Sequence, residues 1–304
     1  MSVDPTPPLP LSSEHVALQF ARRGDLAAAQ FLYGEVATRM MGRLNYIRAT
    51  PQVLVDAGCG AGANYALLHE KYPQAAYTGL DQATTLLEMA RKQHAPRTLR
   101  SLVGKVTGRA TQAPRFIQGD LAATGLAPES VDLVWSNMAL HWHPRPHDVL
   151  GEWRRILKTG ALTMFSCLGP TTLIELRNAL ASAGLKTQTP TFVDMHDFGD
   201  LLIERGFSDP VMDQEVLTLT YRTPQKLLED VRALGGNPAL ERKPGLASRQ
   251  WRDRLLEALE AQRGEDGLIR LSIEVAYGHA WRAGSRRSSA TETRLSVDAI
   301  GGRR

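Results

Sequence analysis

Apolar residues recur along the chain with two spacings, and the alternation of these spacings predicts the architecture. Short apolar runs rich in β-branched residues predict strands, at 53–55, 76–80, 115–118, 131–136 and 161–166. Apolar residues three or four positions apart predict helices between them, at 64–72, 84–93 and 149–157. Strands that alternate with helices are typical of βαβ units. We therefore predict an α/β fold with a doubly wound, mostly parallel sheet and helices on both faces.

Two further regions flank this core, which we place at residues 51–168. Helical spacing fills most of residues 13–50, where Gly24-Asp25 is expected to divide the stretch into two helices. Beyond the fifth strand the pattern changes, with helices expected at 171–183, 198–205, 225–234 and 249–262 and strands at 210–221 and 270–280. We predict that residues 169–282 hold an inserted, partly helical cap together with the last strands of the core.

Three segments lack a clear apolar period. Residues 1–12, which are rich in proline, are expected to form a mobile leader. Residues 283–304 combine arginines with small polar residues and are expected to form a disordered basic tail. Residues 94–114 are polar and basic, and they are longer than a usual connection between elements. We read this last segment as a loop or a frayed helix and assign it no role.

Composition excludes several classes of protein. Hydrophobic residues make up 43% of the chain, enough for a full core. No apolar run approaches the roughly 20 residues that cross a bilayer, and no secretory leader is recognisable. We therefore expect a cytoplasmic protein that does not enter a membrane. Two cysteines, Cys59 and Cys167, are too few for a disulfide framework or a zinc cluster, so no metal is expected. The formal charge of +4 is too small to indicate a nucleic-acid partner.

The strongest chemical signal is a glycine-rich turn, Asp56–Gly62, between the first strand and the following helix. Such a turn lets a ligand approach bare backbone and its free N–H groups. The third glycine follows the second by two residues, which differs from the spacing of dinucleotide-binding turns. Asp56 would repel a pyrophosphate and attract an ammonium group. The pattern therefore favours S-adenosylmethionine (AdoMet), with Gly58, Cys59 and Gly60 beside it; we expect Cys59 to pack there and not to act as a nucleophile.

Two more carboxylates follow the next two predicted strands. Asp81 is expected to accept both ribose hydroxyls, with Gln82 next to it in the cofactor site. Asp120 is expected to accept from the adenine amine, with Leu121 supplying a backbone contact. Each carboxylate taken alone also fits a helix N-cap. Because the carboxyl ends of parallel strands meet at one edge of a sheet, we expect all three to converge on one crevice.

These motifs resemble those of a large enzyme class. Asp56–Gly62, Gly79–Asp81 and Gly119–Leu121 are similar to the successive motifs of class I AdoMet-dependent methyltransferases, and Asp132–Trp142 resembles their fourth motif in the small-molecule branch. The resemblance implies a Rossmann-like sheet with AdoMet as cofactor. Asn137, within the fourth motif, is included in the expected cofactor site, although it also fits a structural role in the turn.

A finer resemblance, to the malonyl-acyl-carrier-protein O-methyltransferases of biotin synthesis, covers the chain from about Ser13 to Trp281. It is carried by Phe20–Arg23, Phe31–Arg39, Ser136–Trp142, Phe165–Arg177, Asp194–Asp197 and Tyr277–Trp281. One departure is Lys158–Ala161, where the family usually has Lys-Pro-Gly-Gly. A sister family of respiratory-complex assembly factors shares the substrate-side motifs. Two alternatives therefore stay open: an AdoMet-binding assembly factor, and a methyltransferase of this fold that acts on another small acceptor.

The finer resemblance implies transfer of the AdoMet methyl group to the free carboxylate of malonyl-acyl-carrier protein or malonyl-CoA. No general base is expected, because carboxylic acids with a reference pKa of about 4 are already ionised at neutral pH. A cation is expected to orient this carboxylate, with Arg177 the first candidate and Arg22 or Arg23 the next.

The remaining expectations concern the substrate side and the partner. Tyr33, His141 and Trp142 are candidates to line the substrate side. Basic residues of the N-terminal helices and the cap are candidates to dock an acidic carrier protein. The enzyme is expected to be a monomer.

Overall fold

A seven-stranded sheet forms the centre of the protein. The computed structural model describes residues 7–22, 26–95, 113–242, 245 and 247–284. The sheet has the order β3-β2-β1-β4-β5-β7-β6. Its strands are β1 (Val53–Ala57), β2 (Ala76–Asp81), β3 (Arg115–Gln118), β4 (Val131–Asn137), β5 (Leu157–Leu168), β6 (Phe207–Tyr221) and β7 (Ile269–Arg282). The first five strands run parallel, and β6 and β7 pair in the antiparallel sense at one side. The predicted fold class is confirmed.

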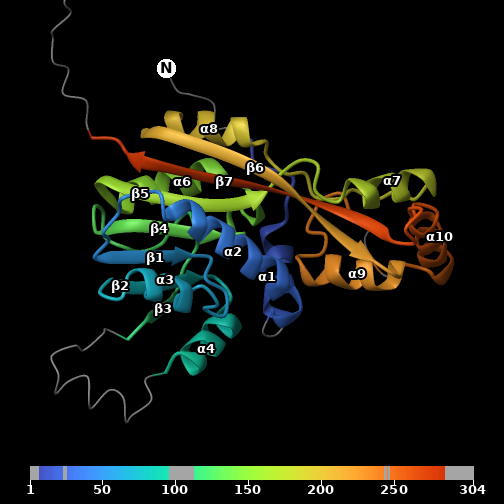
Figure 1. Cartoon of the computed structure of the whole chain (residues 1–304), viewed down its shortest axis with the longest axis horizontal. Helices are drawn as coiled ribbons and strands as arrows, with labels where there is room; N and C mark the ends of the chain where they lie inside the picture. The colour runs from blue at the N-terminus through green and yellow to red at the C-terminus, as the bar shows by residue number, and fades with distance from the viewer. Residues whose placement is uncertain (1–6, 23–25, 96–112, 243–244, 246, 285–304) are drawn as a thin grey trace, which may run out of the picture.

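Helices cover both faces of the sheet (Figure 1). One core cluster contains buried residues of α2 (Gln30–Leu44), α3 (Tyr65–Lys71) and α4 (Thr84–Gln93). The other contains buried residues of α6 (Pro146–Ile156) and α8 (Met195–Glu204). Because the central strands are covered on both sides, β1 and β4 are buried at almost every position. This burial explains why their sequences read as continuous apolar runs.

The cap extends from a long antiparallel pair of strands, β6 and β7. These strands pair from Phe207 with Arg282 to Tyr221 with Ile269, whereas β5 pairs only with the half of β7 from Val275 to Trp281. The other half projects beyond the core and carries α9 (Pro224–Ala233) and α10 (Arg249–Glu260), as Figure 1 shows. Helix α7 (Ile174–Ser182), which follows β5, packs against α10. The cap therefore comes from two separate insertions, while α8 between them packs on β6.

The N-terminal elements lie between the core and the cap. Helix α1 (Ser13–Arg22) is followed by the short 3-10 helix η1 (Ala27–Ala29) and then by α2, so the expected division into two helices is present. Residues 7–12 differ from the expected mobile leader. Leu11 is 4% exposed and forms an isolated bridge with Ala239 of the cap, and Leu9 N donates to Pro144 O at 2.8 Å. Backbone pairing and burial hold this stretch in place.

The structure starts several elements at positions different from those predicted. Helix α7 begins at Ile174 and not at 171, because Leu173 has a φ of 63° and breaks the helical backbone there. Helix α8 begins at Met195, where the Asp194 side chain accepts from His196 N. Most of the expected loop at 94–114 and nearly all of the expected basic tail lie outside the described residues. Within the described ranges, no helix combines the length and the apolar character needed to cross a bilayer.

Candidate active site

A cleft opens at the carboxyl ends of β1, β2, β3 and β4. It encloses about 960 Å³ of empty space including its open mouth. Helices α1 and α2 contribute to its wall. The residues that line it are Val16, Phe20, Leu26, Gln30, Tyr33, Gly58, Cys59, Gly60, Ala61, Ala63, Asn64, Asp81, Gln82, Leu86, Gly119, Asp120, Leu121, Asn137, Met138, Ala139, Trp142 and His143. The strand order changes direction at β1 and β4, the place where open α/β sheets bind ligands.

The glycine turn forms the floor of the cleft. Gly58, Gly60 and Gly62 have φ values of 82°, 54° and 80°, in the left-handed region that favours glycine. A Cβ at Gly58 would lie 2.2 Å from the Cβ of Ala139, so no larger residue fits there. Cys59 is buried, and burial raises the pKa of its thiol well above the usual value. Cys59 therefore packs within the turn, in line with the expectation that it is not a nucleophile.

Asp81, at the end of β2, joins the glycine turn to the next helix. Its Oδ2 accepts from Gly60 N at 2.9 Å, and its Oδ1 accepts from Ala83 N at 2.8 Å. Each carboxylate oxygen can accept a second hydrogen bond. Burial raises the pKa of Asp81, while the backbone donors oppose that shift. Asp81 thus shapes the turn and keeps acceptor capacity on both oxygens for a pair of hydroxyls.

Asp120, after β3, is held from the opposite side of the cleft. Its Oδ1 accepts from Ala122 N at 2.7 Å and lies 3.2 Å from Nε2 of His143. The hydrogen bond with His143 holds the pKa of Asp120 below its usual value. His143 was not among the predicted site residues, because its contact with Asp120, 23 positions away, leaves no local signal in the sequence. Leu121 and Gln82 also line this end of the cleft.

Asp56 occupies a different place from the one expected. Its side chain is 0% exposed and does not line the cleft. It accepts from the Tyr77 hydroxyl at 2.7 Å and from Nδ2 of Asn64 at 3.4 Å. Burial raises the pKa of Asp56 to about 7. The expected direct contact of Asp56 with a ligand ammonium group is therefore wrong in this structure, because Asn64 lies between Asp56 and the cleft.

Tyr33 and Asn137 tie the N-terminal helices to the sheet. The Tyr33 hydroxyl donates to the carbonyl oxygen of Leu234, next to α9, at 2.9 Å. Nδ2 of Asn137 donates to Tyr33 O, and its Oδ1 accepts from Ser166 Oγ, both at 2.9 Å. Both residues line the cleft. Asn137 thus has the structural role that its sequence position left open, whereas its contact with the cofactor stays a prediction.

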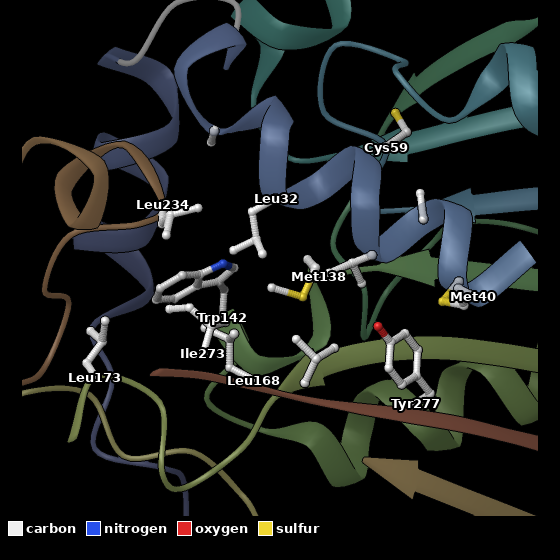
Figure 2. Packing of buried hydrophobic residues seen from close by; sticks show 14 of the residues in the cluster. Leu32, Met40, Cys59, Met138, Trp142, Leu168, Leu173, Leu234, Ile273 and Tyr277 are labelled. Atoms are coloured by element: carbon white, nitrogen blue, oxygen red, sulfur yellow. The ribbon is translucent and has the colours of Figure 1, made fainter. Parts of the chain in front are cut away.

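Trp142 separates the cleft from a second, smaller cavity under the cap. Figure 2 shows its ring among Leu32, Leu234 and Ile273, and these residues line the second cavity with it. Phe20 of α1 meets the ring edge-on, with centroids 6.1 Å apart. The indole therefore forms an apolar partition between the two cavities, and the substrate-side role of Trp142 stays a prediction.

Two other candidates lie away from the cleft. His141 is 4% exposed, its Nδ1 accepts from Leu168 N at 3.3 Å, and burial lowers its pKa to about 3. A neutral, enclosed imidazole of this kind supports packing and does not line the substrate side. Arg177 donates from Nη1 to Thr172 O at 2.5 Å and from Nη2 to Pro170 O at 2.7 Å. Its guanidinium thus satisfies the turn after β5, and Arg177, the first candidate for the orienting cation, is not among the residues that line the cleft.

The charges of the cleft are acidic and not basic. Among the described residues, those that line it include Asp81 and Asp120 but no lysine or arginine. Arg22 is exposed at the end of α1, and Arg23 lies outside the described residues. The glycine turn, the free acceptors on Asp81 and the apolar partition together fit AdoMet, which has a nucleoside, a positive charge and no phosphate.

Comparison with known proteins agrees with this geometry. Residues 55–165 match the family model described as a methyltransferase domain. The malonyl-[acyl-carrier protein] O-methyltransferase of Laribacter hongkongensis is 40% identical over 86% of this chain and 88% of its own. The protein of the same name from Gallionella capsiferriformans is 41% identical over 85% of this chain and 87% of its own.

Solved structures share the fold at low sequence identity. A putative methyltransferase from Bacillus halodurans matches with a TM-score of 0.54 and 15% identity, over 82% of this chain and 100% of its own. Phosphoethanolamine N-methyltransferase 2 of Haemonchus contortus, in complex with S-adenosylhomocysteine, has a TM-score of 0.51 and 14% identity over 85% of this chain and 57% of its own. These likenesses concern the fold alone. The relatives at 40% identity or more, which match most of the chain, show that it belongs to the malonyl-[acyl-carrier protein] O-methyltransferase family of AdoMet-dependent enzymes.

Proposed function

We propose that the protein transfers the methyl group of AdoMet to the free carboxylate of malonyl-acyl-carrier protein and forms the methyl ester early in biotin synthesis. One observation carries this proposal. The methyltransferase domain covers only residues 55–165, whereas the relatives named for malonyl-acyl-carrier protein match 85% or more of the chain. Their match therefore extends beyond the cofactor half, into the helices and cap that form the substrate side.

The chain's residues act by placing the reactants and excluding water. AdoMet, when bound, supplies a methyl group on a positively charged sulfur that an oxygen nucleophile can attack. Asp81 and Asp120 would hold the nucleoside, and Phe20, Met138 and Trp142 would present apolar surface beside it. A carboxylate with a reference pKa of about 4 is ionised at neutral pH. Alignment and desolvation of that carboxylate are therefore the main demands on the enzyme.

We propose that Arg22 supplies the cation that orients the malonyl carboxylate. Arg177 is occupied by two backbone carbonyls, whereas Arg22 is exposed two residues beyond Phe20, which lines the cleft. Replacing Arg22 by alanine should raise the KM for the malonyl substrate. An equal rise in the matched variant Arg177→Ala, with its folding intact, would return the role to Arg177.

The acceptor is tested by supplying purified protein with AdoMet and three acyl substrates. Malonyl-acyl-carrier protein and malonyl-CoA have a free carboxylate, while acetyl-acyl-carrier protein lacks it and serves as the control. We expect a base-labile methyl ester and S-adenosylhomocysteine from the malonyl substrates only, with the carrier-protein form preferred. AdoMet binding without turnover on either malonyl thioester would favour the assembly-factor alternative. Turnover on a different small acceptor alone would favour the other alternative.

We also propose that the enzyme acts as a monomer in the cytoplasm. Cys59 and Cys167 are both free and buried, as suits a reducing compartment. Sedimentation at micromolar concentration tests the oligomeric state, and a mass twice that of the chain would overturn the proposal.

A further inference from the structure

We propose that Asn64 contacts the ammonium group of AdoMet, and that the buried Asp56 is a positioning residue that sets the direction of the Asn64 amide. This inference concerns the cofactor's amino-acid end and is independent of the methyl acceptor. Asn64 thereby has a ligand role that its sequence position does not indicate, and Asp56 has an indirect role in place of the direct one.

The order of the strands determines which end of the cofactor reaches Asn64. The strands β3, β2 and β1 are consecutive neighbours, about 4.8 Å apart. Asp120 follows β3, Asp81 ends β2, and the glycine turn follows β1. Adenine, ribose and amino acid follow one another in the same order along AdoMet. With adenine at Asp120 and ribose at Asp81, the amino-acid end lies over the glycine turn, where Asn64 begins the next helix.

The Asn64 side chain is turned away from its usual local partner. It occupies the N-cap of α3, where asparagine normally accepts from a backbone N–H of the first turn. In this structure the Asn64 side chain makes no capping hydrogen bond. It is 8% exposed, lines the cleft, and directs Nδ2 to the two oxygens of Asp56 at 3.4 and 3.5 Å. Its backbone has a φ of −78° and a ψ of −14°, in the helical region and not in the extended region typical of capping residues. The side chain is therefore oriented by Asp56 and not by a cap.

The Asp56 carboxylate determines which amide atom faces the ligand. An ionised carboxylate only accepts hydrogen bonds, so the NH₂ side of Asn64 must face it. The Tyr77 hydroxyl holds the same carboxylate from another side. Oδ1 of Asn64 therefore faces away from Asp56, and within the described residues nothing donates to it. A free carbonyl oxygen in a cleft, backed by a buried negative charge, is a site for an ammonium group.

Calorimetry with three ligands at pH 7.5 tests the contact in the full-length protein. AdoMet has both the ammonium and the carboxylate, decarboxylated AdoMet keeps the ammonium but not the carboxylate, and 5′-methylthioadenosine lacks both groups and also the sulfonium charge. We expect Asn64→Leu to weaken the first two about 10- to 50-fold, as fits the loss of a charged hydrogen bond. Binding of 5′-methylthioadenosine should change less than twofold. The matched control is Asn45→Leu, at the exposed end of α2, which should leave all three affinities unchanged.

The positioning role of Asp56 is tested by a double-mutant cycle. Asp56→Asn should weaken the two ammonium-bearing ligands, and the loss in the double variant should be smaller than the sum of the two single losses. Equal weakening of all three ligands by Asn64→Leu would mean that Asn64 only supports the turn. If Asn64→Leu weakened the binding of AdoMet but not of decarboxylated AdoMet, Asn64 would contact the carboxylate of the cofactor and not its ammonium group. Unchanged affinities in Asn64→Leu, or fully additive losses in the cycle, would also overturn the proposal.

Discussion

At the scale of residues, three aspartates at the ends of neighbouring strands have different environments. Asp120 is half-buried, and its hydrogen bond with His143 lowers its pKa. Asp81 is more deeply enclosed, and burial raises its pKa. Asp56 is completely enclosed, and its pKa rises to about 7. The same residue type at the same kind of strand end therefore yields two groups that line the cleft and one that is buried away from it.

The first prediction concerns the ribose contact of Asp81. In Asp81→Asn one acceptor oxygen becomes a donor, so one of two hydroxyl hydrogen bonds is lost. We expect the Kd for S-adenosylhomocysteine, measured by calorimetry, to rise about 10- to 100-fold. Asp81 also accepts hydrogen bonds from Gly60 N and Ala83 N. Thermal unfolding without ligand therefore serves as the control, because it shows whether the substitution destabilises the turn. An unaltered Kd would remove the ribose assignment.

The second prediction concerns the pH dependence of cofactor binding. The titratable groups around Asp56 are Tyr77, Cys59 and Asp81. A cationic ligand favours ionised Asp56, so its pKa must be lower in the complex than the value of about 7 without ligand. Binding is then strongest above pH 7 and weakens as the pH falls through that value.

We expect the Kd of decarboxylated AdoMet to rise about fivefold or more from pH 7.5 to 5.5, because protonation of Asp56 removes the charge behind the amide. This ligand keeps its ammonium charged throughout that range. Asp56→Asn is the control and should flatten the profile. A slope of the same size in that variant would assign the titration to Asp81 instead.

At the scale of elements, one indole ring joins three separate parts of the chain. Trp142 lies in the 3-10 helix η2 (Leu140–Trp142) after β4. It meets Phe20 of α1 and Phe192 of the segment before α8. Gly235, just after α9, lies so close that a Cβ there would be 2.2 Å from Cζ2 of Trp142. The position of the cap and the shape of the cleft are therefore coupled through this ring.

The third prediction uses that close approach. Gly235→Ala must displace the indole or the cap, and overpacking of this kind costs roughly 1–3 kcal/mol. We expect a lower free energy of unfolding in urea and a higher KM for the malonyl substrate. The matched control is Gly42→Ala in α2, which meets no atom within 4 Å and should stabilise the helix by up to about 1 kcal/mol. If Gly235→Ala behaved like the control, the packing argument would be wrong.

At the scale of the whole molecule, some exposed arginines are held in ion pairs and others are not. Arg39 pairs with Glu35 and Glu215, and Arg43 pairs with Asp213. These pairs fasten α2 to β6, so the N-terminal helices offer fewer free cations than their sequence indicates. Exposed arginines of the cap, Arg232, Arg249 and Arg252, make no ion pair within the described residues. We therefore expect an acidic carrier protein to dock mainly on the cap.

The fourth prediction is that docking depends on salt. Exposed charges are screened over about 8 Å at physiological ionic strength, so the KM for malonyl-acyl-carrier protein should rise steeply between 50 and 300 mM salt. Malonyl-pantetheine, which has no carrier charge, should show a flat KM. Replacing Arg232 and Arg252 together by alanine should reduce the slope for the carrier substrate. A flat KM for that substrate would contradict electrostatic docking.

The sequence by itself determined those features that arise from neighbouring residues. Helix α4 spans Thr84–Gln93 and β3 spans Arg115–Gln118, the ranges that apolar spacing predicts. The glycine turn and the strand-end position of Asp81 were also predictable, because local backbone conformation and parallel strand order place them. Such features depend on a few consecutive side chains and on a period, both of which the chain displays directly.

Only the tertiary structure decided which side chains face the ligand. Asp120 meets His143 across 23 positions of sequence, and Tyr33 meets Leu234 across 201. The sealing of Asp56 behind Asn64 depends on Tyr77 of the neighbouring strand, and the direction of Arg177 depends on the carbonyls of a turn. Burial and hydrogen bonding between distant residues settle these orientations, and no local pattern records which distant partners will meet.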